Sequence, residues 1–333
     1  MPNRRDPEVP GRGADADAAG PPLPPRALRD LPWELPHRFL GLDGPEASFD
    51  RAGAVILPVP YESTTSYGGG TRAGPGAILE ASRFLELYDQ EHAGEPSRHG
   101  IHTLPALELT REGSTAAMAE LEAHYGQVLE VLDGRLPVML GGEHAISAPA
   151  IRATAGRLGA ERLSVLQMDA HADLRDGYEG APWSHASFAY RTLDVADFVQ
   201  VGIRAVSTPE VEVMDREEGV HVIWAQEMFG GPDDEWMDRA LEALGSRVYL
   251  TFDVDYFDPS LMPSTGTPEP GGGDWYRTLR FLRRVFSERE VVGMDVVELA
   301  PAPGLHAPDF LVAKLVYKLL GYHFEATAGR GTS

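Results

Sequence analysis

The chain has 333 residues, of which 43% are hydrophobic, enough for one large domain that buries a substantial core. Its formal net charge of −22 argues against nucleic acid or an anionic membrane surface as a partner and favours cations, either metal ions or a cationic substrate. Because there is no cysteine, disulfides, thiolate catalysis, zinc fingers and iron–sulfur clusters are excluded.

The first segment of the chain differs in texture from the rest. Residues 1–30 are rich in Pro, Gly, Ala and charge, so we expect a flexible tail there, a folded domain over 31–325 and a short tail over 326–333. The N-terminus lacks the apolar core of a signal peptide, and no run of about 18 apolar residues occurs. These features predict a cytoplasmic protein with no membrane span.

Short apolar segments alternate with amphipathic ones from Leu31 onward, a pattern typical of strand–helix units around a parallel sheet. Most of the apolar segments are apolar on both faces, as expected for strands covered by helices on each side. The predicted strands are 54–60, 137–142, 163–169, 198–204, 221–225, 248–255 and 291–299.

Three amphipathic segments are predicted to be helices: 114–134, 274–289 with Asp274 as its cap, and 308–321 between Pro308 and Gly321. There is no internal repeat and no boundary between domains. We therefore expect a single three-layer α/β domain, with helices on both faces of a mostly parallel central sheet.

The run MDAHADLRD follows one predicted strand directly. In extended backbone, residues two apart point the same way, so Asp169, His171 and Asp173 are expected to share one face. Asp253 and Asp255 repeat this spacing at the end of a second strand.

His144, in GGEHAIS, follows a third strand. The carboxyl ends of parallel strands form the ligand-binding edge of a sheet, so the side chains that follow these three strands are expected to converge there.

A single Asp-X-Asp pair is more often a solvated loop or a helix cap than a metal site, and Asp-X-His-X-Asp is more specific. Three such elements, each ending an apolar strand, favour a metal site over unrelated surface charge. Clustered carboxylates repel one another, and metal binding relieves that repulsion. Oxygen and imidazole ligands without thiolate suit Mn, Mg, Fe(II), Co or Ni, and shared carboxylates can bridge two ions about 3.5–4 Å apart that generate hydroxide at neutral pH.

These elements, in this order, resemble the ureohydrolase family of arginase and agmatinase, and the agmatinase branch in particular. The resemblance covers 50–323 and implies an arginase-like fold. It is carried by VPYESTTSYGGGTRAGPGAILEAS (59–82), MLGGEHAIS, MDAHADLRD, SHAS (184–187), FDVDYFDPSLMPSTGTPEPGG (252–272) and GMDVVELAP (293–301), of which 252–272 is the most specific.

The resemblance implies two metal ions, usually manganese, with Co²⁺ and Ni²⁺ as alternatives. Asp169 and Asp253 would bridge the ions. One ion would be completed by His144 and Asp173, and the other by His171 and Asp255.

The resemblance also implies a mechanism, in which a metal-bridging hydroxide attacks the guanidinium carbon and the intermediate collapses to urea and an amine. Asp173 would pass the proton to the amine, and His185 in SHAS would shuttle protons beside the substrate. Glu298 would hold the guanidinium, consistent with its place at a strand end and with the need of a planar cation for a carboxylate. Thr267 would line the guanidinium pocket. The alternatives are a solvent-facing glutamate, an ordinary loop histidine and a turn threonine; Glu143 has no assigned role.

The loop after Asp173 resembles agmatinases rather than arginases, and Asp176 and Glu179 in it would favour a cationic substrate tail. Agmatine, cleaved to urea and putrescine, is the expected substrate. N1-aminopropylagmatine, guanidinobutyrate and guanidine are alternatives. Among the remaining histidines, only His306 is expected near the pocket, at its edge.

Two other classes of function compete with this hypothesis. A single-zinc deacetylase shares the fold type but lacks the paired motifs seen here. A catalytically silent regulatory homologue would usually have lost ligands, whereas all six positions carry metal-competent side chains. The resemblance also implies a homo-oligomer, a trimer or a hexamer.

Overall fold

The structure, a computed structural model, describes residues 37–159 and 161–330; the predicted tail at 1–30 lies outside them. Eight strands lie in the described residues: β1 (Ala54–Val59), β2 (Ile101–Thr103), β3 (Leu136–Gly141), β4 (Leu163–Met168), β5 (Ala196–Ile203), β6 (Val220–Trp224), β7 (Arg247–Asp253) and β8 (Glu290–Val297). The α-helices are α2 (Gly74–Ser82), α3 (Ser114–Val131), α4 (Ser147–Leu158), α5 (Thr208–Arg216), α6 (Glu227–Gly230), α7 (Asp233–Ala243), α8 (Trp275–Glu288) and α9 (Ala307–Arg330).

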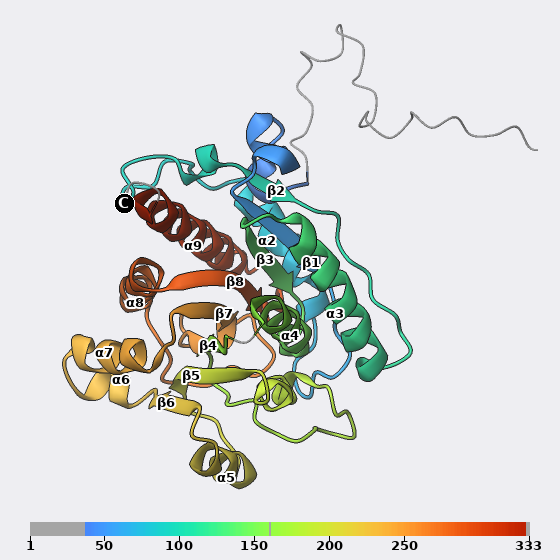
Figure 1. The fold of residues 1–333 in the computed structure, drawn as a ribbon, viewed down its shortest axis with the longest axis vertical. Helices are drawn as coiled ribbons and strands as arrows, with labels where there is room; N and C mark the ends of the chain where they lie inside the picture. The colour runs from blue at the N-terminus through green and yellow to red at the C-terminus, as the bar shows by residue number, and fades with distance from the viewer. Residues whose placement is uncertain (1–36, 160, 331–333) are drawn as a thin grey trace, which may run out of the picture. The chain divides into compact units, whose positions relative to one another are not determined.

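All eight strands form one sheet, in the order β2-β1-β3-β8-β7-β4-β5-β6, and every neighbouring pair is parallel (Figure 1). The sequence predicted seven of these strands. It missed β2, because three residues around the half-buried His102 are too few to show an apolar period.

Alternate side chains of the longer strands enter two separate apolar cores, one on each face of the sheet. In β1, Ile56 packs into the core formed with α2, α7, α8 and α9, whereas Val55 packs into the core formed with α3 and α4. The two helical layers lie on opposite sides of the sheet (Figure 1). This arrangement explains why the strands are apolar on both faces, and it confirms the predicted three-layer α/β fold.

The helix ends were predicted with mixed success. Asp274 caps α8, as expected, by accepting a hydrogen bond from the backbone N–H of Arg277 at 3.0 Å. The predicted helix end at Gly321 was wrong, since α9 continues to Arg330 and residues 326–330 are helical. Gly321 is needed for close packing instead: a Cβ there would lie 2.3 Å from Nε2 of His92.

Four neighbouring strands in the centre of the sheet, β3, β8, β7 and β4, end at the same level. The register pairs Leu140 with Val296, Val296 with Phe252, and Phe252 with Met168. The residues that follow these strands therefore lie side by side at one edge. Among the described residues, no helix is long and apolar enough to cross a membrane.

Candidate metal centre and substrate pocket

Two groups of His and Asp side chains meet at this edge of the sheet. One group consists of His144, Asp169 and Asp173, and the other of Asp169, His171 and Asp255. Within each group the ligand-type atoms lie within 4.8 Å of one another, and Asp169 belongs to both. The structure thus brings together the side chains that the spacing predicted.

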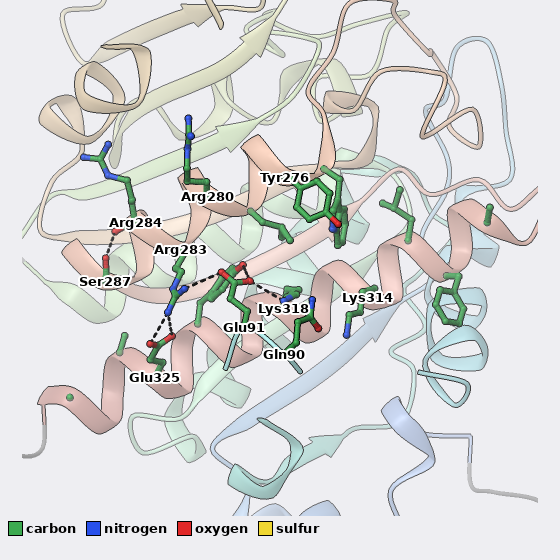
Figure 2. Close-up of a pocket in the computed structure, with 18 of the residues that line it drawn as sticks. Gln90, Glu91, Tyr276, Arg280, Arg283, Arg284, Ser287, Lys314, Lys318 and Glu325 are labelled. Atoms are coloured by element: carbon green, nitrogen blue, oxygen red, sulfur yellow. Dashed lines mark hydrogen bonds and ion pairs between the residues drawn. The ribbon is translucent and has the colours of Figure 1, made fainter. Parts of the chain in front are cut away.

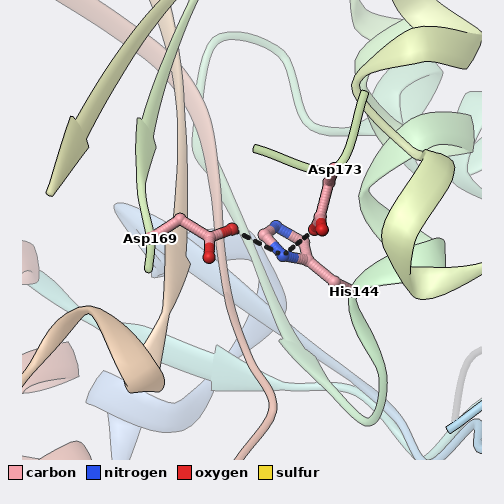
Figure 3. A group of neighbouring side chains, drawn as sticks. All are labelled: His144, Asp169 and Asp173. Atoms are coloured by element: carbon pink, nitrogen blue, oxygen red, sulfur yellow. Dashed lines mark ion pairs between the residues drawn. The ribbon is translucent and has the colours of Figure 1, made fainter. Parts of the chain in front are cut away.

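His144 lies at the centre of the first group (Figure 3). Its Nδ1 is 3.2 Å from Oδ2 of Asp169, of Asp173 and of Asp253. Although this nitrogen is buried, it makes no hydrogen bond of suitable geometry with any described residue. Three carboxylate oxygens therefore surround one nitrogen that can serve at most one of them as a donor.

The other nitrogen of the His144 ring is held by a chain of buried hydrogen bonds. Nε2 lies 2.8 Å from Oγ1 of Thr251, whose hydroxyl donates to Oδ1 of Asp295 at 2.6 Å. Because that hydroxyl has a single proton, it accepts from Nε2–H of His144. The neutral ring then carries its lone pair on Nδ1, facing the three carboxylates, as a metal ligand requires.

In the second group, His171 approaches the same carboxylates from the side of the solvent. Its Nδ1 lies 2.9 Å from Oδ2 of Asp255 and 3.7 Å from Oδ1 of Asp169. The His171 side chain is 26% exposed, whereas those of the two aspartates are almost completely buried. The second group is therefore the more open of the two.

Backbone amides hold the carboxylates in place. Oδ1 of Asp255 accepts from the N–H of Ala170, and Oδ1 of Asp253 accepts from the N–H of Asp255. Oδ1 of Asp169 accepts from the N–H of His171, at 2.6 Å. The first of these bonds connects the loop after β4 to the loop after β7, and the other two are local. The main chain therefore orients the carboxylates of both motifs.

Counting the protein's own groups alone, the cluster carries an excess of buried negative charge. Burial raises the pKa of Asp253 well above its ordinary value, and the charges of Asp255 and Asp169 raise it further. Burial and the charge of Asp169 raise the pKa of Asp173 to about 7. Burial would lower the pKa of His144, but its contacts with Asp169, Asp173 and Asp253 raise it. All three shifts show a site in which additional positive charge is stabilising.

Glu298 lies one residue beyond β8, beside this cluster. Its Oε1 accepts from the backbone N–H of His144 at 2.6 Å, while its Oε2 has no hydrogen bond with the described residues. Burial raises its pKa to about 8. Glu298 and Asp173 both have left-handed backbones, with φ of 67° and 52°, and such strain in non-glycine residues often marks functional sites.

A further chain of hydrogen bonds orients His185. Glu143, buried beside His144, accepts from the N–H groups of Ser63 and Thr64 and from the Thr64 hydroxyl. Oγ1 of Thr64 in turn accepts from the N–H of His185 and lies 3.2 Å from its Nδ1. Burial lowers the pKa of His185 to about 4, so its ring is neutral at pH 7. The sequence left the role of Glu143 open; in the structure its carboxylate holds the segment at Ser63 and Thr64, which in turn contacts His185.

The predicted site residues that reach solvent do so in one cavity of about 290 Å³. Both metal-type groups open into it, together with Glu298, His185 and Thr267. Thr267 is therefore on the wall of the same cavity as the metal-type groups. The cavity is lined by Thr65–Gly68, His144, His171, Asp173, Arg175, Tyr178, His185, Ala186, Ala205, Val206, Glu210, Asp253, Asp255, Gly266, Thr267, Glu269 and Glu298.

A larger cavity of about 1430 Å³ lies elsewhere, between α8 and α9 (Figure 2). There Glu91 pairs with Arg283 and Lys318, and Arg283 also pairs with Glu325. No group of metal-ligating side chains was found at this cavity among the described residues. His306 lines it and does not line the cavity of the metal centre, so its predicted place at the edge of the site was wrong.

The two acids expected to favour a cationic substrate tail are also placed differently. Asp176 forms an ion pair with Arg191, and neither Asp176 nor Glu179 lines the cavity of the metal centre. Besides Glu298, the acidic residues of its wall outside the metal centre are Glu210 and Glu269, which the sequence did not single out.

Comparison with known proteins identifies the scaffold on which this centre is built. Residues 52–321 match the arginase family. The chain belongs to the arginase family. Members of this family are binuclear metal-dependent enzymes, in keeping with the two His–Asp groups that share Asp169.

Several similar arginase-family proteins are named as ureohydrolases or agmatinases. The N(1)-aminopropylagmatine ureohydrolase of Synechocystis sp. is 41% identical over 87% of this chain and 95% of its own length. The agmatinase of Pyrococcus horikoshii is 29% identical over 86% of this chain and 97% of its own. In structure, the agmatine ureohydrolase of Thermoplasma volcanium has a TM-score of 0.76 and 29% identity, covering 86% of this chain and 95% of that one. This arginase-family chain is therefore a ureohydrolase, as its motifs predicted.

Several supporting residues of the site could not have been found by spacing. Thr64, Thr251 and Asp295 act through side-chain hydrogen bonds between elements far apart in the chain. Thr251 and Asp295 sit inside the buried strands β7 and β8, where a polar residue among apolar neighbours was the one available signal.

Proposed function

We propose that the chain hydrolyses the guanidino group of a guanidino amine to urea and the free amine, at a centre of two metal ions. The observation that carries this proposal is the position of His144 Nδ1, which is buried, makes no hydrogen bond with the described residues, and lies 3.2 Å from three carboxylate oxygens. Such a nitrogen is costly to bury unless it has a partner, and a cation ligated by it together with the carboxylates supplies one.

The donor set fits the proposed metal. Four carboxylates and two imidazoles, without thiolate, suit Mn²⁺, which we propose as the native ion, with Co²⁺ or Ni²⁺ as substitutes. Asp169 and Asp253 would be shared between the ions. His144 and Asp173 would complete one ion, and His171 and Asp255 the other. When bound, such a pair lowers the pKa of water so that it can attack at neutral pH.

The chain's own groups would bind and orient the substrate in the cavity beside this centre. Glu298 would accept N–H groups of the guanidinium through Oε2, which has no other partner among the described residues, while Oε1 stays on the His144 backbone. Thr267, on the same wall, would help to define the guanidinium pocket.

Two side chains would handle protons. His185 is neutral and is held through Nδ1 by Thr64, which leaves Nε2 to accept or release a proton in the cavity. Asp173 would deliver a proton to the departing amine. The Thr64–Glu143 contact would keep His185 in this orientation.

Agmatine is the substrate that the motifs alone favour, and the relatives shift the order of the candidates. Relatives at 41–42% identity are named N(1)-aminopropylagmatine ureohydrolases, whereas the Pyrococcus agmatinase is 29% identical. We therefore propose a cationic guanidino amine, with N1-aminopropylagmatine and agmatine as the first two substrates to test. Guanidinobutyrate and guanidine follow.

The test is a urea-release assay with Mn²⁺, Co²⁺ or Ni²⁺ over these four substrates and arginine. Turnover confined to guanidino amines is the expected result. Release of urea from none of them by fully metal-loaded protein would overturn the proposal and favour a silent homologue.

We also propose that the protein is a homo-oligomer, either a trimer or a hexamer. Size-exclusion chromatography with light scattering, which gives the mass of the assembly, would test this.

A further inference from the structure

Glu269 stands apart among the acidic residues around the cavity. Its carboxylate forms no hydrogen bond or ion pair with any residue in the described part of the chain, and its side chain is half-exposed. The other acids of the wall are engaged in the cluster or in local structure. Glu210 is the clearest case, since it accepts from the N–H groups of Leu174 and Ser207 and from the Ser207 hydroxyl.

The loop that carries Glu269 is firmly attached to the metal centre. The guanidinium of Arg204 donates from Nε and Nη2 to the carbonyl of Glu269, and from Nη2 to the carbonyl of Asp255 at 2.6 Å. On either side of Glu269, the N–H of Gly271 binds the Asp258 carboxylate and the carbonyl of Ser264 accepts from Ala300. The position of Glu269 is therefore fixed relative to Asp255.

One cation of the wall could oppose a cationic ligand, and it is already balanced. Nε of Arg175 lies 3.6 Å from Oε2 of Glu210, and its guanidinium stacks on the ring of Tyr178. Glu269 is thus left as a carboxylate in the wall that has no partner of its own among residues 37–159 and 161–330. A carboxylate in that situation attracts an ammonium group entering the cavity.

We propose that Glu269 is a specificity-determining residue that binds the distal ammonium group of the substrate, at the end opposite the guanidinium. This inference rests on the proposed function and adds to it the group that selects the tail. It replaces Asp176 and Glu179 in that role, since neither lines the cavity. The interaction is with a part of the substrate that does not react, so it contributes to binding in the ground state and the transition state alike.

The experiment varies both the charge of the substrate tail and the charge of the side chain at position 269. Metal-loaded wild type and Glu269→Gln are compared on N1-aminopropylagmatine and agmatine, on butylguanidine, whose tail is uncharged, and on 4-guanidinobutanoate, whose tail is anionic. Loss of one charge-assisted hydrogen bond predicts about a tenfold fall in kcat/KM for the first two, mostly through KM. Butylguanidine should change by less than about twofold, and 4-guanidinobutanoate should improve. Asp176→Asn, which removes the same charge outside the cavity, is the matched control and should change none of them.

Equal loss on all four substrates, or no loss on the two cationic ones, would overturn the inference while leaving the proposed function standing. If the wild type releases urea from none of them, the proposed function fails, and calorimetric titration of the metal-loaded protein with agmatine then decides the subsite. Weaker binding to Glu269→Gln than to wild type would support it, and equal or absent binding to both would overturn it.

Discussion

At the scale of single residues, the site depends on which atom of each side chain faces the cluster. His144 presents Nδ1 because Thr251 accepts from its Nε2 and donates to Asp295, a chain that lies inside the sheet. The two oxygens of Glu298 also differ: Oε1 accepts from the backbone N–H of His144, and Oε2 remains available for a ligand. Each functional atom is thus selected by a neighbouring group that has no part in the chemistry.

Asp253→Asn is expected to remove one proposed shared ligand. Urea release should fall by more than about 100-fold. Mutating even a hydrogen-bond partner of a metal ligand lowers metal affinity or activity by about 10–100-fold, and here the ligand itself is changed. Bound metal, measured by elemental analysis, should fall with it. The metal-free variant should remain folded, since the change relieves repulsion from Asp255 and Asp169. Normal activity in this variant would disprove the assignment of the centre.

Glu298→Gln is expected to separate substrate binding from metal binding. The amide keeps an oxygen for the N–H of His144, so metal content should match that of the wild type. The loss of charge opposite a guanidinium should lower kcat/KM by roughly 10–100-fold, the range for a hydrogen bond between charged groups. Wild-type rates would remove Glu298 from the guanidinium pocket.

At the scale of elements, ion pairs connect α9 to the loop at 89–91. Nζ of Lys318, whose side chain is 3% exposed, lies 2.8 Å from Oδ1 of Asp89 and 2.9 Å from Oε2 of Glu91. The hydroxyl of Tyr322, one turn further along α9, also donates to Glu91. The helix packs over the core of one face, so this network fixes how the layer sits on the sheet.

Asp89→Asn is expected to destabilise the fold by about 3 kcal/mol or more, because it leaves the Lys318 ammonium buried with half of its partners. Glu161→Gln, at the exposed pair with Arg247, is the matched control and should cost less than about 1 kcal/mol. Unfolding midpoints at pH 7 measure both. A variant as stable as the control would show that the network is dispensable.

The lowered pKa of Asp89 predicts that its contribution to stability depends on pH. Burial alone would raise the pKa of Asp89, but the hydrogen bond and charge of Lys318 hold it at about 2, below its ordinary value of 3.8. A lowered pKa in the folded state stabilises the protein above the ordinary value, and this contribution disappears as the pH falls through the lower one. The difference in stability between wild type and Asp89→Asn should therefore shrink between about pH 4 and pH 2. A constant difference across that window would contradict the proposed ion pair.

At the scale of the whole molecule, the centre joins the ends of separate strands. His144 follows β3, Asp169 and His171 follow β4, and Asp253 ends β7. These strands are distant in the sequence, so ions held among them would crosslink the middle of the sheet. Repulsion within the cluster would be relieved at the same time.

Metal binding is therefore expected to stabilise the entire fold. Mn²⁺ at about 100 times its dissociation constant should add about 2.7 kcal/mol, seen as a rise in the thermal midpoint that a chelator reverses. Asp253→Asn should show a much smaller rise. The absence of any shift with Mn²⁺, Co²⁺ or Ni²⁺ would contradict a metal centre.

The sequence by itself determined the layers, seven of the eight strands and the metal-type residues. Those features depend on local patterns, namely apolar segments of strand length and carboxylates two residues apart, which act through the backbone geometry of a single strand. The register of the parallel sheet then placed Asp169, Asp253 and His144 at one edge, as the pattern predicted.

The tertiary structure decided what depends on contacts between segments remote in the sequence. A contact with β7 sets the tautomer of His144, which follows β3, and Thr64 orients His185. The cavity is lined by Glu269 and not by Asp176 or Glu179. Likewise, α9 continues past Gly321, since this glycine allows close packing against His92 and does not end the helix. No local pattern encodes such contacts, since each depends on which two elements the fold brings together.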